Sequence, residues 1–187
     1  MNKAKLVLSL FIMISISTFA QKKAVNVEKS QVEWTGNKIG GSHNGQINIK
    51  SASLVFDGEN IVGGDIVIDM TSIVDKDLED ATYNAKLVGH LKSDDFFGVE
   101  KFPTSNFKIT KSTAFKNGKA TLHGELTIKK KTEKIEFEII KAGNSYTAQV
   151  KIDRSKFDVR YGSNSFFDNL GDKAIDDIFI LDIKLEI

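Results

Sequence analysis

The sequence predicts an all-β protein whose strands form a single antiparallel sheet. Apolar and polar residues alternate along most of the chain, as in "ATLHGELTIK" at 120–129, where Leu122, Leu126 and Ile128 share one face. Such alternation is typical of antiparallel strands with one buried and one solvated face. A sheet of about eight one-sided strands must bury its apolar face, and closing into a barrel is one economical way to do so. A two-sheet sandwich fits the same pattern and is the alternative.

The expected strands follow one another with short turn sequences between many of them. Three of these turns are "DGEN" at 57–60, "KNG" at 116–118 and "AGNS" at 142–145. Several of the strands are long for a globular sheet. We expect eight strands, near 31–37, 45–56, 60–70, 106–116, 119–128, 134–142, 145–153 and 177–187.

Two long connections interrupt the strands. The first, 71–105, contains "NAKLVGHLKS", in which Leu87, Val88 and Leu91 have helical spacing, so we expect a short helix there. The second, 154–176, is rich in glycine, asparagine and aromatic residues. Each connection carries a Phe-Phe pair, and connections this long inside a compact domain are usually functional or lid-like.

The first 20 residues have the pattern of a secretory signal peptide. Lys3 and Lys5 precede an apolar run at 6–16, and a small-residue cleavage pattern ends at Ala20. The run is short for a membrane span, so an uncleaved anchor is the weaker interpretation. We expect cleavage near Ala20 and a periplasmic or secreted mature chain, residues 21–187, that forms one domain.

Composition excludes several classes of function. Removal of the leader takes two lysines from the 26 basic residues and no acid from the 25 acidic ones, so the net charge changes from +1 to −1. This balance argues against a nucleic-acid partner, which requires a basic surface. The chain contains no cysteine, which rules out disulfides, thiolate nucleophiles and cysteine metal sites.

The sequence shows no pattern for catalysis or metal binding. No two of the three histidines have the spacing of a local metal site. "DKDLEDATYNAK" at 75–86 resembles a calcium loop, but Asp80 replaces the required glycine and Lys86 the bidentate glutamate. The acidic run is better explained as capping charge ahead of the helix. We therefore predict no catalytic residue, no metal and no cofactor.

Three polar residues are candidates for contact with a ligand's polar end. His43 lies in a glycine-flanked segment, and Arg154 and Arg160, the two arginines of the chain, lie just past a predicted strand. An arginine at a barrel rim can bind an anion or a carbonyl group with forked hydrogen bonds. The alternative for the arginines is a structural ion pair with a nearby aspartate. The basic stretch "KKKTEK" at 129–134 is expected to be a hairpin turn, with weak contact to a membrane surface as a second interpretation.

Four motifs together resemble the YceI-like family over essentially the whole mature chain, from about residue 25 to 187. They are "WTGNKIGGSHNGQINI" at 34–49, "GHLKSDDFFGVEKFPTSNFKI" at 89–109, "GELTIKKKTEKIEFE" at 124–138 and "IDRSKFDVRYG" at 152–162. The second is the most specific, with its leucine, serine, acidic, Phe-Phe and aromatic-proline pattern. One departure is the turn filled here by "KKK", where the family often has a glycine.

The resemblance implies a lipocalin-like, eight-stranded antiparallel β-barrel in the periplasm or outside the cell. It implies binding of a long isoprenoid lipid, such as an isoprenoid quinone or a polyprenyl phosphate, in an apolar lumen. It also implies roles in transport, storage or stress response, homodimers in some members, and no established enzymatic activity. Two alternatives stay open: a filled-core barrel that binds a protein partner, and an enzyme that modifies such a lipid.

For the apolar lumen we predict the inward residues of the strands together with aromatic and aliphatic residues of the two long connections. They are Trp34, Leu54, Phe56, Ile66, Ile68, Leu87, Leu91, Phe96, Phe97, Phe102, Phe107, Ile109, Leu122, Leu126, Phe137, Ile139, Val150, Ile152, Phe157, Phe179 and Leu181.

Overall fold

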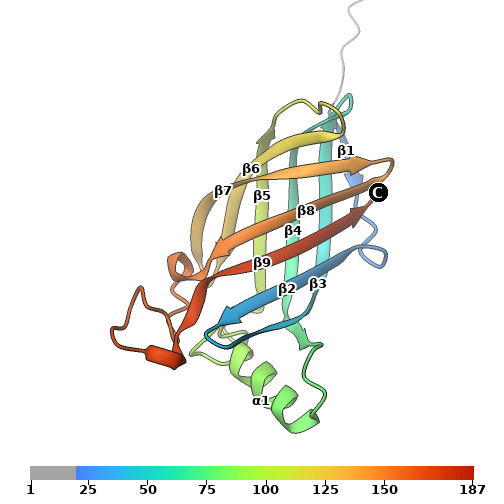
Figure 1. Ribbon diagram of the computed structural model, residues 1–187. Coiled ribbons are helices and arrows are strands. Elements are labelled where there is room, and N and C mark those ends of the chain that lie inside the picture. The colour runs from blue at the N-terminus through green and yellow to red at the C-terminus, as the bar shows by residue number, and fades with distance from the viewer. Residues whose placement is uncertain (1–19) are drawn as a thin grey trace, which may run out of the picture.

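A closed barrel of eight antiparallel strands forms the body of the protein in the computed structural model, which describes residues 20–187 (Figure 1). The expected signal peptide lies outside the described residues, apart from Ala20. The barrel strands are β2 (Gln31–Lys38), β3 (Gly41–Asp57), β4 (Asn60–Asp75), β5 (Thr104–Ser112), β6 (Lys119–Ile128), β7 (Lys131–Ala142), β8 (Ser145–Asp153) and β9 (Ile175–Glu186). The other elements are β1 (Gln21–Ala24), α1 (Ala81–Lys92) and two 3-10 turns, η1 (Arg154–Phe157) and η2 (Gly171–Lys173).

Pairing between β2 and β9 closes the barrel. Each strand from β2 to β9 pairs antiparallel with the next one in the chain, and β9 returns to pair with β2 from Gln31↔Lys184 onward. The sheet is therefore continuous around the barrel, which confirms the barrel and rules out the two-sheet sandwich. Closure pairs β2 with β9, each of which would otherwise be an edge strand of the sheet.

The two ends of the barrel differ. One end, called here the α1 end, carries α1, the β2–β3 and β6–β7 turns and the connection between β8 and β9 (Figure 1). The other, called here the hairpin end, carries the β3–β4, β5–β6 and β7–β8 turns. Rings fill the hairpin end, where Tyr146 lies 6.1 Å from Phe56 and 6.2 Å from Phe115, measured between centroids. These aromatic rings therefore narrow the hairpin end.

Hydrogen bonds cap both ends of helix α1. The Asp80 side chain is the N-cap and accepts hydrogen bonds from the backbone N–H groups of Thr82 and Tyr83, which confirms a capping role for part of the acidic run. Leu87, Val88 and Leu91 are half-buried. Across residues 20–187, no helix has the length and apolar character needed to cross a bilayer.

Several strand boundaries differ from the sequence prediction, and β3 and β7 begin three or four residues earlier than expected. The short β1, which was not predicted, pairs residues 21–24 with 53–56 of β3, and its side chains are all exposed, so no alternation marks it. The strand expected at 106–116 ends at Ser112, whose hydroxyl donates to the backbone carbonyl of Ile61. The strand expected to end at 70 continues to Asp75.

The extension of β4 contains a bulge that changes which side chains face inward. The β3–β4 register moves from Asn48↔Asp69 to Gln46↔Val74, so four residues of β4 stand opposite one residue of β3. Such an insertion reverses the inside–outside phase of the strand. Beyond the bulge, Ile73 and Asp75 are buried instead of exposed.

The β7–β8 hairpin pairs over only a short length. Its ladder runs from Ala142↔Ser145 to Ile140↔Thr147, whereas β8 pairs with β9 along its whole length. The two strands separate toward the α1 end (Figure 1). Backbone pairing between β7 and β8 is therefore confined to the hairpin end.

Candidate functional site

A cavity of about 360 Å³ occupies the lumen of the barrel. All eight barrel strands and α1 contribute to its lining, which is overwhelmingly apolar. Along β9 the lining runs from Ile175 to Leu185, which is about 30 Å of strand at ~3.3 Å per residue. The filled-core alternative is therefore wrong for this barrel, because the interior is not closed by protein atoms from end to end.

Most residues predicted for the lumen line this cavity. They are Trp34, Leu54, Ile66, Ile68, Leu87, Leu91, Phe96, Phe97, Phe107, Ile109, Leu122, Leu126, Phe137, Ile139, Val150, Ile152, Phe179 and Leu181. Their contact with a ligand stays a prediction, but the structure brings them to one continuous wall.

Three predicted lumen residues lie elsewhere. Phe56, 4% exposed, packs on Tyr146 at the closed hairpin end, and Phe157, 1% exposed, is buried in η1. Phe102 lies beneath the ammonium group of Lys130, 5.7 Å from its ring centroid. All three are packing residues, because apolar side chains fill the ends of the barrel as well as lining its lumen.

The first Phe-Phe pair closes part of the α1 end. The rings of Phe96 and Phe97 meet edge to face with centroids 5.2 Å apart, and Phe97 lies 6.3 Å from Phe179 of β9. Gly98, with φ of +58°, turns the chain directly after them. Both rings line the cavity, so this segment anchors the loop and forms lumen wall at once. The second pair, Phe166-Phe167, is instead exposed.

Arg154 is buried and its guanidinium is bound by the protein itself. Its Nε donates to the carbonyl of Asp176, Nη1 to those of Val159 and Tyr161, and Nη2 to that of Ile175, all at 2.9–3.0 Å. Nη2 also lies 3.4 Å from Oδ1 of Asp177. Burial lowers the pKa of Arg154 from its very high ordinary value. Arg154 touches the cavity, but its donors fasten the β8–β9 connection, which favours the structural alternative.

Arg160 and His43 have different positions relative to the cavity. Arg160 is exposed, donates to Asp158 at 2.6 Å and lies 5.0 Å over the Phe166 ring, away from the lumen. Arg160 is not among the residues that line the cavity, and its contact with a ligand's headgroup stays a prediction. His43 does line the cavity at the α1 end.

Further lining residues were missing from the prediction. Met70, Tyr146, Ala148, Ile183 and Leu185 line the lumen and are in phase with neighbours that were chosen, so the alternation would have found them. Others depend on tertiary structure. Ile73 faces inward only because of the β4 bulge, and His90 and Tyr161, whose ring centroids are 4.3 Å apart, come from two different connections.

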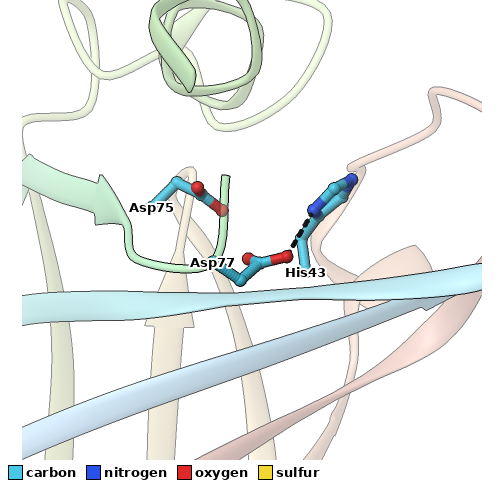
Figure 2. A group of neighbouring side chains, drawn as sticks. All are labelled: His43, Asp75 and Asp77. Atoms are coloured by element: carbon cyan, nitrogen blue, oxygen red, sulfur yellow. Dashed lines mark hydrogen bonds and ion pairs between the residues drawn. The ribbon is translucent and has the colours of Figure 1, made fainter. Parts of the chain in front are cut away.

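His43, Asp75 and Asp77 form a polar cluster beside the cavity mouth (Figure 2). One ligand atom of each lies within 4.8 Å of the others, and His43 Nδ1 is 3.0 Å from Asp77 Oδ2. Burial raises the pKa of Asp75. Burial also opposes the charge of Asp77, but hydrogen bonds from the Asn44 N–H and the His43 ring lower its pKa. Asp75 therefore ionises less readily than an ordinary aspartate, and Asp77 more readily.

Comparison with known proteins gives one family and several related structures. The YceI-like domain matches residues 24–187. A UPF0312 protein of Vibrio parahaemolyticus is 30% identical over an alignment of 137 residues that covers 66% of this chain and 69% of that protein.

Solved structures share the fold. BcnA of Burkholderia cenocepacia is 24% identical with a TM-score of 0.67, over 86% of this chain and 98% of that one. A polyisoprenoid binding domain from Saccharophagus degradans, implicated in plant cell wall breakdown, is 10% identical with a TM-score of 0.59, over 87% and 95% of the two chains. At these identities the structures show a common fold.

Proposed function

Because this chain belongs to the YceI-like family, we propose that it binds one long-chain isoprenoid lipid, an isoprenoid quinone or a polyprenyl phosphate, inside the barrel. The observation that carries the proposal is the long apolar cavity of the lumen, open toward the α1 end. The polyisoprenoid binding domain of the same fold supports the same ligand class.

The shape and polarity of the cavity suit an amphiphile with one slender apolar tail. An eight-stranded barrel has room for side chains or for one small ligand. The deep wall is built from residues such as Leu54, Leu122 and Leu185, whereas Lys38, His43 and Asp176 lie toward the α1 end. The tail would therefore extend toward the hairpin end, with the polar headgroup at the α1 end.

The tail supplies most of the binding free energy. Each buried CH₂ contributes roughly 0.8 kcal/mol, so one five-carbon unit contributes on the order of 4 kcal/mol before losses. Association and ordering of the chain cost about 4–15 kcal/mol. A few buried units therefore exceed this cost, and binding does not depend on a strong headgroup contact.

The proposed role is transport, storage or sequestration of the lipid, without chemical change. The leader supports a periplasmic or secreted location, and the exposed rings of Phe166 and Phe167 at the α1 end are compatible with brief contact with a membrane surface. A homodimer remains a prediction from the family resemblance.

Mass spectrometry of an organic extract tests the proposal directly. Protein purified without detergent is expected to release an isoprenoid quinone or a polyprenyl phosphate at up to one molecule per chain. Protein that yields no lipid, and takes up no added isoprenoid quinone after delipidation, would contradict it.

A further inference from the structure

We propose that His43, Asp75 and Asp77 bind one divalent transition-metal ion at the α1 end of the barrel. The three side chains come from β3, from the last residue of β4 and from the segment just after it. Figure 2 shows them gathered around a common space, with the dashed line between His43 and Asp77. This site is independent of the proposed lipid function.

A buried oxygen without a partner points to a missing cation. Asp75 is only 7% exposed, and its Oδ2 has no hydrogen-bond partner among the described residues. A buried carboxylate oxygen without a donor is unfavourable, and buried charges in proteins are normally paired or coordinate metals. A proton held between the two carboxyl groups is the alternative, and the experiment below separates the two.

Neighbouring groups hold both carboxylates in place. Asp75 Oδ1 accepts from the Leu78 N–H at 2.9 Å and from Asn84 Nδ2 at 3.1 Å. Asp77 Oδ1 accepts from the Asn44 N–H at 2.8 Å. Each carboxylate thus has one oxygen held by N–H donors, and its other oxygen either has no partner, as in Asp75, or faces the His43 ring, as in Asp77. Outer hydrogen bonds orient metal ligands in this way.

The donor set indicates the class of metal. One imidazole nitrogen with two carboxylate oxygens suits Zn²⁺ and similar ions, whereas Ca²⁺ and Mg²⁺ favour oxygen ligands alone. Tetrahedral Zn²⁺ with bonds near 2.0–2.1 Å requires ligand atoms about 3.3 Å apart. His43 Nδ1 and Asp77 Oδ2 are 3.0 Å apart, close to this spacing, and a ligand atom of Asp75 lies within 4.8 Å of both residues, so a small closing movement of the side chains would complete the site.

Three protein ligands leave at least one coordination position for water or another oxygen ligand. His43 also lines the cavity, so the ion would stand beside its mouth. Sequence spacing does not reveal the site. Asp75 and Asp77 lie in a segment that only resembles a calcium loop, and the third ligand, His43, comes from another strand.

Isothermal titration of the EDTA-treated protein with zinc chloride tests this inference. We expect one Zn²⁺ per chain. We expect His43→Gln and Asp75→Asn each to weaken binding at least about tenfold, since even outer-shell changes cost 10–100-fold. The matched control is His123→Gln, because His123 forms a similar 3.0 Å pair with Glu136 but, among residues 20–187, belongs to no cluster with a second carboxylate. Its affinity for zinc is expected to stay unchanged.

Nuclear magnetic resonance of the wild-type protein gives a result that requires no variant. Of the three imidazole signals, that of His43 is expected to shift on addition of one equivalent of Zn²⁺, while those of His90 and His123 stay in place. The inference is overturned if wild-type protein binds no Zn²⁺, or if binding survives both His43→Gln and Asp75→Asn, or if the His43 signal does not respond.

Discussion

The guanidinium carbon of Arg154 lies 5.3 Å over the ring of Phe96. This stacking joins the connection after β8 to the connection after α1, so the two long segments of the chain close the α1 end together. Arg154 donates to two backbone carbonyls of the β8–β9 connection and to two at the start of β9, and Phe96 forms cavity wall in the connection after α1. The shape of the cavity mouth therefore depends on Arg154, whose charged group binds backbone carbonyls of the protein.

Replacing Arg154 by methionine is expected to destabilise the protein by on the order of 3 kcal/mol, because it leaves buried carbonyls without donors. Urea unfolding measures this loss. Arg160→Met is the matched control, since Arg160 forms an exposed pair with Asp158 and its loss is expected to cost less than about 1 kcal/mol. Equal losses for the two variants would contradict the structural role.

Filling the lumen is expected to prevent lipid binding without unfolding the barrel. Ala148 is a small lining residue of β8, and Ala148→Trp would occupy the path of the tail. Lipid recovered by extraction is expected to fall at least about tenfold, since losing one five-carbon unit removes roughly 4 kcal/mol. Gln149→Trp adds the same ring to the exposed face of β8 and is expected to leave the lipid content unchanged. Equal content in both variants would place the ligand outside the lumen.

The β6–β7 turn is expected to tolerate glycine at one position and not at the other. Lys129 and Lys130 have φ of +48° and +62°, a conformation that costs a non-glycine residue roughly 1 kcal/mol. Lys130→Gly is expected to change the stability by less than about 0.5 kcal/mol, because relief of the positive φ offsets the lost contact of Lys130 with the Phe102 ring. Lys129→Gly is expected to destabilise the protein by more, because Lys129 Nζ donates to the carbonyls of Phe96 and Asp158. Thermal unfolding of both variants measures the difference, and an equal Tm for the two would contradict the role of Lys129.

Asp69 is expected to stabilise the fold only while it is ionised. The Thr71 hydroxyl donates to Asp69 Oδ1 at 2.6 Å and holds the pKa of that carboxyl below its ordinary value. A carboxyl with a lower pKa in the folded state stabilises above its unfolded pKa, and the effect is lost as the pH falls through the folded value. The Tm advantage of wild type over Asp69→Asn should therefore narrow below about pH 4. In a Thr71→Val background this pH-dependent advantage should shrink, because only the N–H of residue 71 still donates to Asp69 Oδ1, and an undiminished advantage would contradict the assignment.

The barrel strands were predictable because alternation is a local signal that the burial of one face imposes. In β6, residues Leu122, Leu126 and Ile128 are buried as expected, and the glycine-containing turns after β3 and β7 fall where predicted. The strand β1 carries no such signal, since only its backbone pairs with β3.

The details of the site depended on interactions that no local pattern contains. The bulge in β4 turned Asp75 inward and brought it to His43, a residue of another strand. The sequence could not distinguish Phe157 from the lining residues, because residues that close a barrel end and residues that line its lumen are of the same apolar types. For Arg154, only the positions of four carbonyls decided between structure and ligand.

Fluorescence of Trp34 during titration with a long-chain isoprenoid quinone tests the central claim most directly. Trp34 is the single tryptophan of the chain and lines the lumen, so a quinone bound there should quench it. Delipidated protein is expected to show saturable quenching at one quinone per chain, and a quinone without an isoprenoid tail is expected to bind far more weakly. Unsaturable quenching, or equal affinity for the tailless quinone, would contradict a lumen that holds the isoprenoid tail.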